Sequence, residues 1–117
     1  MRNVDLIYKI ASAEVVEASR RMGTFTGMAV DLADGYVHFS TAEQLPDTLR
    51  LHFRGQSDLV LLAVRTADLD SALTWEPSRG GALFPHLYGQ MSMSVVAHEA
   101  PIAVDDDGRC DLPEWVQ

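Results

Sequence analysis

DGYVHFST, residues 34–41, is the stretch that decides the fold of this chain, because a turn there leads into a strand with two different faces. Side chains alternate across a strand, so Val37 and Phe39 share one face, which we expect to pack into the core. The opposite face then carries three polar side chains, those of Tyr36, His38 and Ser40. A phenol, an imidazole and a hydroxyl on one face are typical of a surface that contacts a polar ligand.

Size and composition predict one globular domain over residues 1–117. The chain is 47% hydrophobic and 22% charged, which is ordinary for a globular protein. Its net charge is −8, and residues 105–117, with five acids and one arginine, form an acidic C-terminal tail. No cluster of Lys and Arg is present to bind phosphates along a duplex, so we expect no double-stranded nucleic acid partner.

The same features predict a cytoplasmic protein. A single cysteine, Cys110, allows no disulfide within the chain, which suits a reducing compartment. No stretch approaches the roughly 20 apolar residues needed to span a bilayer, and the N-terminus lacks the apolar core of a secretory signal. We therefore expect no membrane association.

Two helices are expected. Ser12 is typical of an N-cap and Gly23 of a C-terminal stop, which predicts a helix over 13–22. A second helix should begin near Leu45 with Pro46 in its first turn, because proline inside a helix removes a hydrogen bond. Two capping boxes are available to it, Ser40-x-x-Glu43 and Thr41-x-x-Gln44. The glycine-rich residues 23–35 predict a loop with a short extended piece near 28–30.

The remaining elements are mainly strands, which predicts a small α+β domain of about five to seven strands and two main helices. The most apolar run, 58–65, indicates a central strand covered on both faces. A short helical turn is expected over 66–72, and a turn over 105–108. Leu112 and Trp115 of the tail are expected to dock on the domain. The other expected strands cover 5–10, 73–76 and 93–100.

Residues 75–89 form a second chemically rich segment, which we expect to be a long loop because it contains five glycines and prolines. In a ligand site, Trp75 or Tyr88 would provide a stacking surface and Arg79 a fork for phosphate. Glu76 would be a hydrogen-bond acceptor or base, and His86 a further ligand contact. The alternative is a packed surface loop with Trp75 as its core anchor and Glu76 as a solvated acid.

Metal and nucleophile chemistry are not favoured. His38, His86 and Glu76 are suitable ligand types for zinc, yet the chain has no HxH, HxxxH or CxxC spacing. We expect no native metal. No nucleophile elbow, Walker loop or GxGxxG motif is present.

Several motifs in order resemble domain-of-unknown-function family 952, a family of small bacterial proteins. The similar segments are Ile7-Tyr8-Lys9-Ile10, Asp31-x-x-Asp34 followed by Gly35 to Thr41 and Gln44, Trp75-Glu76, and Phe84-Pro85-His86-Leu87-Tyr88-Gly89. The resemblance covers nearly the whole chain. It departs at Val16, where the family often has a tryptophan, and at Pro46.

The resemblance implies an ADP-ribosyltransferase-like fold, in which two small, bent, mixed or antiparallel sheets enclose a cleft for NAD. By this analogy His38 would hold the ribose position, with Ser40 and Thr41 close behind it. The late-strand glutamate of active transferases has only Glu99 as a counterpart, without the usual paired residue. The expected function is therefore binding of NAD or an ADP-ribose-like nucleotide as a ligand, and no cofactor is assigned.

Two alternatives remain open. One is an active ADP-ribosyl or 2′-phosphate transferase, in which His38 and Glu76 would be the catalytic residues and Arg79 would stabilise a pyrophosphate. The other is a protein-interaction domain without enzymatic activity, whose partner the sequence does not identify.

Overall fold

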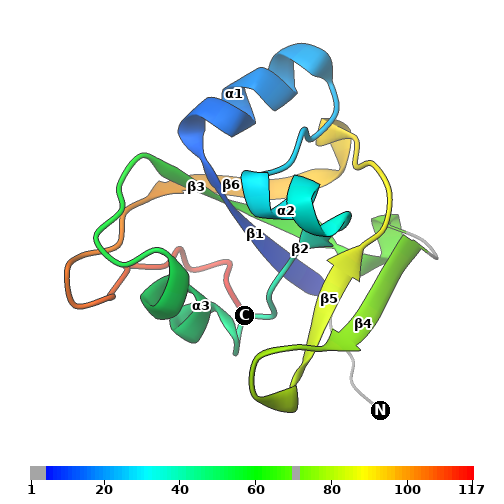
Figure 1. Ribbon diagram of the computed structural model, residues 1–117. Coiled ribbons are helices and arrows are strands. Elements are labelled where there is room, and N and C mark those ends of the chain that lie inside the picture. Colours follow the sequence, from blue (N-terminus) through cyan, green and yellow to red (C-terminus); the bar gives the residue numbers. More distant parts are fainter. Residues whose placement is uncertain (1–4, 70–71) are drawn as a thin grey trace.

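The computed structural model describes residues 5–69 and 72–117, and over these residues two antiparallel sheets pack with helices, which confirms the α+β class (Figure 1). The first sheet has the strand order β1-β3-β6, with β1 at Leu6–Ser12, β3 at Leu59–Arg65 and β6 at Val96–Ile102. The second has the order β2-β5-β4, with β2 at Val37–His38, β5 at Leu83–Leu87 and β4 at Leu73–Pro77.

The central strand β3 separates two hydrophobic cores. Leu62 and Val64 face one core together with Val16 of helix α1 (Ala13–Met22). Leu61 and Ala63 alternate with them and face the other core, where helix α3 (Leu45–His52) packs. The expected strand covered on both faces is therefore confirmed.

A continuation of β2 joins the two sheets. Ser40 pairs with Tyr8 of β1 through two backbone hydrogen bonds of 2.8 and 2.9 Å, while Phe39 N–H donates to the carbonyl of Pro85 in β5. The 34–41 stretch thus contacts both sheets, and Val37 and Phe39 are buried in the core as expected.

Both predicted helices are confirmed: α1 has the predicted bounds, and α3 begins at Leu45 as predicted. Ser12 caps α1 by accepting a hydrogen bond from Val15 N–H, and Pro46 lies in the first turn of α3. Of the two capping boxes, Thr41 and Gln44 form the reciprocal one just before α3 begins.

The expected loop is confirmed over 23–28, but the extended piece expected near 28–30 is wrong, because the chain forms a third helix there, α2 (Ala29–Asp34). The helix is capped at its C-terminal end by Gly35, which adopts a left-handed conformation (φ 85°) and donates its N–H to the carbonyl of Asp31. Asp31 also accepts from Met28 N–H, so a buried side chain closes the first turn. In Figure 1, α2 lies in front of β1 and β2.

The expected long loop over 75–89 is also largely wrong. β4 and β5 pair in register from Leu73–Leu87 to Pro77–Leu83 and form a hairpin. Only its tip is irregular, with a short 3-10 turn η3 at Arg79–Gly81. Two further 3-10 turns are η1 at Thr66–Asp68 and η4 at Met93–Val95. The predicted turn over 66–72 begins with η1, and residues 70–71 lie outside the described residues.

The C-terminal tail docks beside α3 (Figure 1), as predicted. Trp115 stacks on Tyr8 and on His98, with ring centroids 6.4 and 5.1 Å apart. The backbone N–H of Gln117 donates to the Tyr8 hydroxyl at 3.0 Å. Among the described residues, no helix has the length and apolarity to cross a bilayer.

Candidate functional site

The second sheet brings chemically active side chains from three strands to one face. His38 of β2 pairs with His86 of β5, which in turn pairs with Thr74 of β4. Paired residues of an antiparallel sheet point to the same side, and so do residues two apart. Glu76, two residues after Thr74, therefore belongs to this same face, opposite the face that packs on the core.

Tyr36 lies at the centre of a cluster of rings on this face. Its ring centroid is 4.3 Å from that of His86, 4.5 Å from His38 and 5.1 Å from Tyr88. The two imidazoles are 5.5 Å apart, edge to face. Burial and the nearby carboxylates of Asp34 and Glu76 raise the pKa of Tyr36, so its hydroxyl stays protonated at neutral pH.

His38 is held by carboxylates on both ring nitrogens. Its Nδ1 is 2.7 Å from Asp31 Oδ1 and its Nε2 is 2.9 Å from Asp34 Oδ2. The backbone N–H of His38 also donates to Asp31 Oδ1 at 3.0 Å. Both acids come from α2, so the unpredicted helix determines how this imidazole is oriented.

Behind His38 lies a buried ion pair. Lys9 Nζ of β1 is 2.8 Å from both oxygens of Asp31, and the two side chains are only 4% and 3% exposed. Burial alone would raise the pKa of Asp31, but the Lys9 charge and the hydrogen bonds from Lys9 and His38 together lower it below its ordinary value. Asp31 is therefore an ionised carboxylate that anchors α2, β1 and β2 to one another.

His86 has a separate carboxylate. Its Nδ1 is 2.7 Å from Glu76 Oε1, which also accepts a hydrogen bond from the Tyr88 hydroxyl at 2.8 Å. The hydrogen bonds from His86 and Tyr88 hold the pKa of Glu76 below its usual range. The same hydrogen bond raises the pKa of Tyr88. Glu76 is thus ionised and works as an acceptor for two neighbours.

A cavity of about 540 Å³ opens beside the two imidazoles. Its walls come from β1, the start of α2, α3 and the β4–β5 hairpin. Four basic side chains line it, those of Lys9, His38, His52 and His86. Hydroxyl groups come from Ser40, Thr48 and Ser78, and aromatic surface from Phe53 and Phe84. No described carboxylate lines this cavity.

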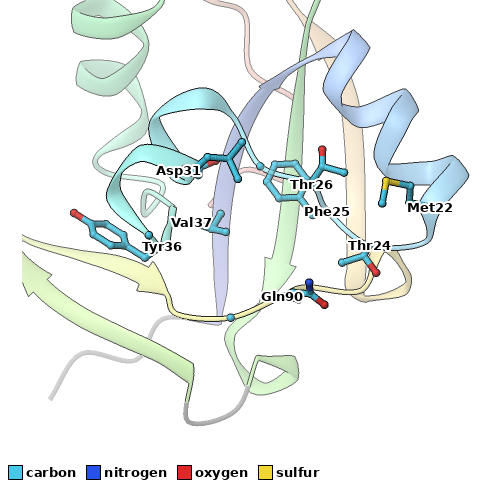
Figure 2. A pocket seen from close by; sticks show the side chains of 12 residues that line it. Met22, Thr24, Phe25, Thr26, Asp31, Tyr36, Val37 and Gln90 are labelled. Atoms are coloured by element: carbon cyan, nitrogen blue, oxygen red, sulfur yellow. The ribbon is translucent and has the colours of Figure 1, made fainter.

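A second, more open cavity of about 720 Å³ lies on the other side of α2. Figure 2 shows Phe25 and Asp31 in its middle, with Met22 and Tyr36 at opposite ends of the view. No site was predicted here, and the lining includes three glycines, Gly27, Gly35 and Gly89. Asp31 and Tyr36 connect it to the histidine cluster.

The structure brings five of the predicted site residues together: Tyr36, His38, Glu76, His86 and Tyr88. Ser40 lines the 540 Å³ cavity, although its hydroxyl is also hydrogen-bonded to Thr48.

Two predicted site residues are not brought to the cluster, and the side chain of a third, Arg79, is not described. Thr41 is buried and engaged in the capping box with Gln44. Trp75 lies on the opposite face of β4, because side chains alternate there, and packs against the core. The side chain of Arg79 lies outside the part of the chain that the structure describes.

Lys9, Asp31 and Asp34 were missed as site residues. A signal for Lys9 was present, because the only lysine of the chain occurs inside an apolar strand, where a buried ammonium needs a counter-charge. Asp31 and Asp34 were hidden by the assignment of their segment to a loop. Among the described residues, no group of three or more His, Cys, Asp or Glu side chains is arranged to hold a metal ion.

Comparisons with known proteins identify a family and similar solved structures. A family model described as a protein of unknown function (DUF952) matches residues 10–99. The crystal structure of protein CC0527 from Caulobacter crescentus is 50% identical over 91% of this chain and 93% of that chain, with a TM-score of 0.86. The solution NMR structure of CC0527 is 51% identical over 88% and 89%, with a TM-score of 0.78. No curated protein matches the chain. The resemblance seen in the sequence is thereby confirmed, and the chain belongs to the DUF952 family.

Proposed function

We propose that this chain binds a phosphorylated nucleotide, NAD or an ADP-ribose-like compound, in the cavity beside His38 and His86. The observation that carries the proposal is the lining of this cavity. Basic nitrogens and hydroxyl groups gather there with aromatic surface, and no described carboxylate faces it, although the chain has a net charge of −8. Such a lining favours an anionic ligand with a planar base.

The size of the cavity supports the same proposal. A volume of about 540 Å³ is within the range of small-molecule sites. Phe53 and Phe84 offer apolar surface to a base, while His52 and Ser78 offer hydrogen-bond donors to phosphate oxygens. The carboxylates of Asp31 and Glu76 lie behind the imidazoles, where they orient these rings.

The test is a thermal shift measurement with NAD, ADP-ribose and a 2′-phosphorylated nucleotide. A ligand that binds only the folded state raises the melting temperature by mass action. We expect a rise in the parent that is lost in His38→Ala and kept in Arg21→Ala, a matched loss of a basic side chain exposed on α1. Absence of a shift with all three compounds would refute the proposal.

A transferase would convert NAD to products, whereas a binding protein would leave it unchanged. Release of nicotinamide from NAD, measured on the same samples, would support an ADP-ribosyl transferase. The placement of Glu76 behind His86, away from the cavity lining, favours a binding protein over this reading. Copurification of a protein partner without any nucleotide shift would favour the interaction domain.

We further propose an ADP-ribosyltransferase-like arrangement and a bacterial, cytoplasmic origin. The two small sheets joined through Tyr8 and Ser40 are compatible with that fold. The relative from Caulobacter crescentus supports a bacterial source. A single cysteine supports a reducing compartment. Fractionation of the source cells is the measurement that tests the location.

A further inference from the structure

The hydrogen bonds around Glu76 determine where the proton of His86 lies. Glu76 Oε1 accepts from the Tyr88 hydroxyl at 2.8 Å and lies 2.7 Å from His86 Nδ1. An ionised carboxylate can only accept hydrogen bonds, so His86 Nδ1 must carry a proton. The low pKa of Glu76 and the raised pKa of Tyr88 keep both partners in these roles at neutral pH.

The opposite nitrogen of His86 is open. No hydrogen bond joins His86 Nε2 to a described residue. Every fully buried side-chain nitrogen or oxygen among the described residues has a hydrogen-bond partner, so Nε2 is not fully buried. Nε2 is therefore reached by solvent, although the His86 side chain is only 5% exposed. His86 is also one of the residues that line the 540 Å³ cavity.

The ring of His86 cannot easily turn away from this arrangement. It lies on a strand between β2 and β4, and Tyr36 packs over it at a centroid distance of 4.3 Å. In a neutral imidazole with its proton on Nδ1, Nε2 holds a lone pair. His86, a residue of the cavity lining, then holds a fixed hydrogen-bond acceptor at Nε2.

His38 differs in this respect. Both of its nitrogens lie within 3 Å of carboxylate oxygens, those of Asp31 and Asp34. Neither nitrogen is left as an acceptor for a ligand. Of the two imidazoles in the cluster, only His86 has a ring nitrogen that can accept a hydrogen bond from a ligand.

We propose that His86 accepts a hydrogen bond at Nε2 from a hydroxyl group of the bound ligand, and that Glu76 is the positioning residue that fixes the required tautomer. This inference rests on the proposed nucleotide cavity and names the chemical feature that the cavity selects. A sugar hydroxyl is the donor that a phosphorylated nucleotide carries beside its phosphates.

The first experiment determines the tautomer of His86 in the absence of any ligand. Long-range ¹H–¹⁵N correlation spectra of ¹⁵N-labelled protein distinguish a protonated from an unprotonated ring nitrogen. We expect the neutral His86 ring to carry its proton on Nδ1 in the parent and in the control Glu14→Gln, an exposed α1 variant. In Glu76→Gln the side-chain amide can donate to Nδ1, so the Nε2-protonated tautomer should increase. A parent ring protonated on Nε2, or no change in Glu76→Gln, would overturn the inference.

The second experiment tests whether His86 Nε2 accepts a hydrogen bond, using ligands that differ by one hydroxyl group. Affinities of ADP, 2′-deoxy-ADP and 3′-deoxy-ADP are compared by calorimetry. We expect one deoxy compound to bind the parent about tenfold more weakly than ADP, as for one lost hydrogen bond. In His86→Phe, which keeps a flat ring without the acceptor, ADP and that compound should bind equally. An unchanged ratio in His86→Phe would overturn the inference. Failure of ADP to bind, together with no thermal shift from NAD, ADP-ribose or the 2′-phosphorylated nucleotide, would refute the proposed function instead, and the spectra alone would then decide the state of His86.

Discussion

Asp31 is the residue on which the site depends, because one carboxylate serves three segments of the chain. It pairs with Lys9, accepts from the backbone and ring of His38, and accepts from Met28 N–H. Asp31→Asn leaves the buried ammonium of Lys9 without a counter-charge. We expect a loss of about 3–5 kcal/mol in the free energy of unfolding, measured by urea denaturation.

Asp34→Asn is the matched control, because Asp34 bonds to the other nitrogen of the same histidine but is 45% exposed. This exposed contact should contribute less than about 1 kcal/mol. Equal losses in the two variants would contradict the importance of burial at Asp31.

Acid should weaken the fold through the same residue. The pKa of Asp31 is lowered in the folded state, so its contribution to stability is complete above the unfolded pKa of about 3.9. It is lost as the pH falls through the lower folded pKa. We expect the unfolding free energy of the parent to decrease more steeply between pH 4 and pH 2 than that of Asp31→Asn. Parallel curves over this range would show that Asp31 titrates alike in both states.

At the scale of elements, the sequence predicted strands and helices wherever a cap or an apolar pattern was local. Ser12, Gly23 and Pro46 identified α1 and α3 in this way. Helix α2 was missed because the glycines that flank it were interpreted as marks of a loop, whereas Gly35 ends the helix. The strand predicted over 73–76 is confirmed as β4, but its partner β5 was missed because Pro85 is unusual inside a strand. In both cases pairing with distant residues outweighed the local preference.

Gly35 is the position where α2 can be tested as an element. Its φ of 85° is costly for residues with a side chain, although a Cβ there would meet no atom within 4 Å. Gly35→Ala should therefore cost about 1–2 kcal/mol in stability from backbone strain alone. Gly35→Asn should cost less, because asparagine adopts this conformation more readily. Urea denaturation of both variants gives the comparison, and equal losses would argue against strain as the cause.

At the scale of the whole molecule, β1 and β3 belong to both cores, so the two cores should not unfold separately. Ile7 and Leu62 lie in one core, and Tyr8 and Leu61 in the other. Adjacent residues of one strand cannot lose their pairing independently. This coupling also explains how the docked tail supports the site, since Tyr8 contacts Trp115 through its ring and Ser40 through its backbone.

The two tryptophans report the two cores, because Trp75 packs against the first and Trp115 against the second. Trp115→Phe leaves Trp75 as the fluorescent probe, and Trp75→Phe leaves Trp115. In each variant we expect the urea midpoint from fluorescence to equal the midpoint from far-UV circular dichroism, as in a two-state transition. If Trp115 reported an earlier transition than the backbone signal of its own variant, the tail would be a separate unit. The residues that orient His38 would then be supported by the sheets and α2 alone.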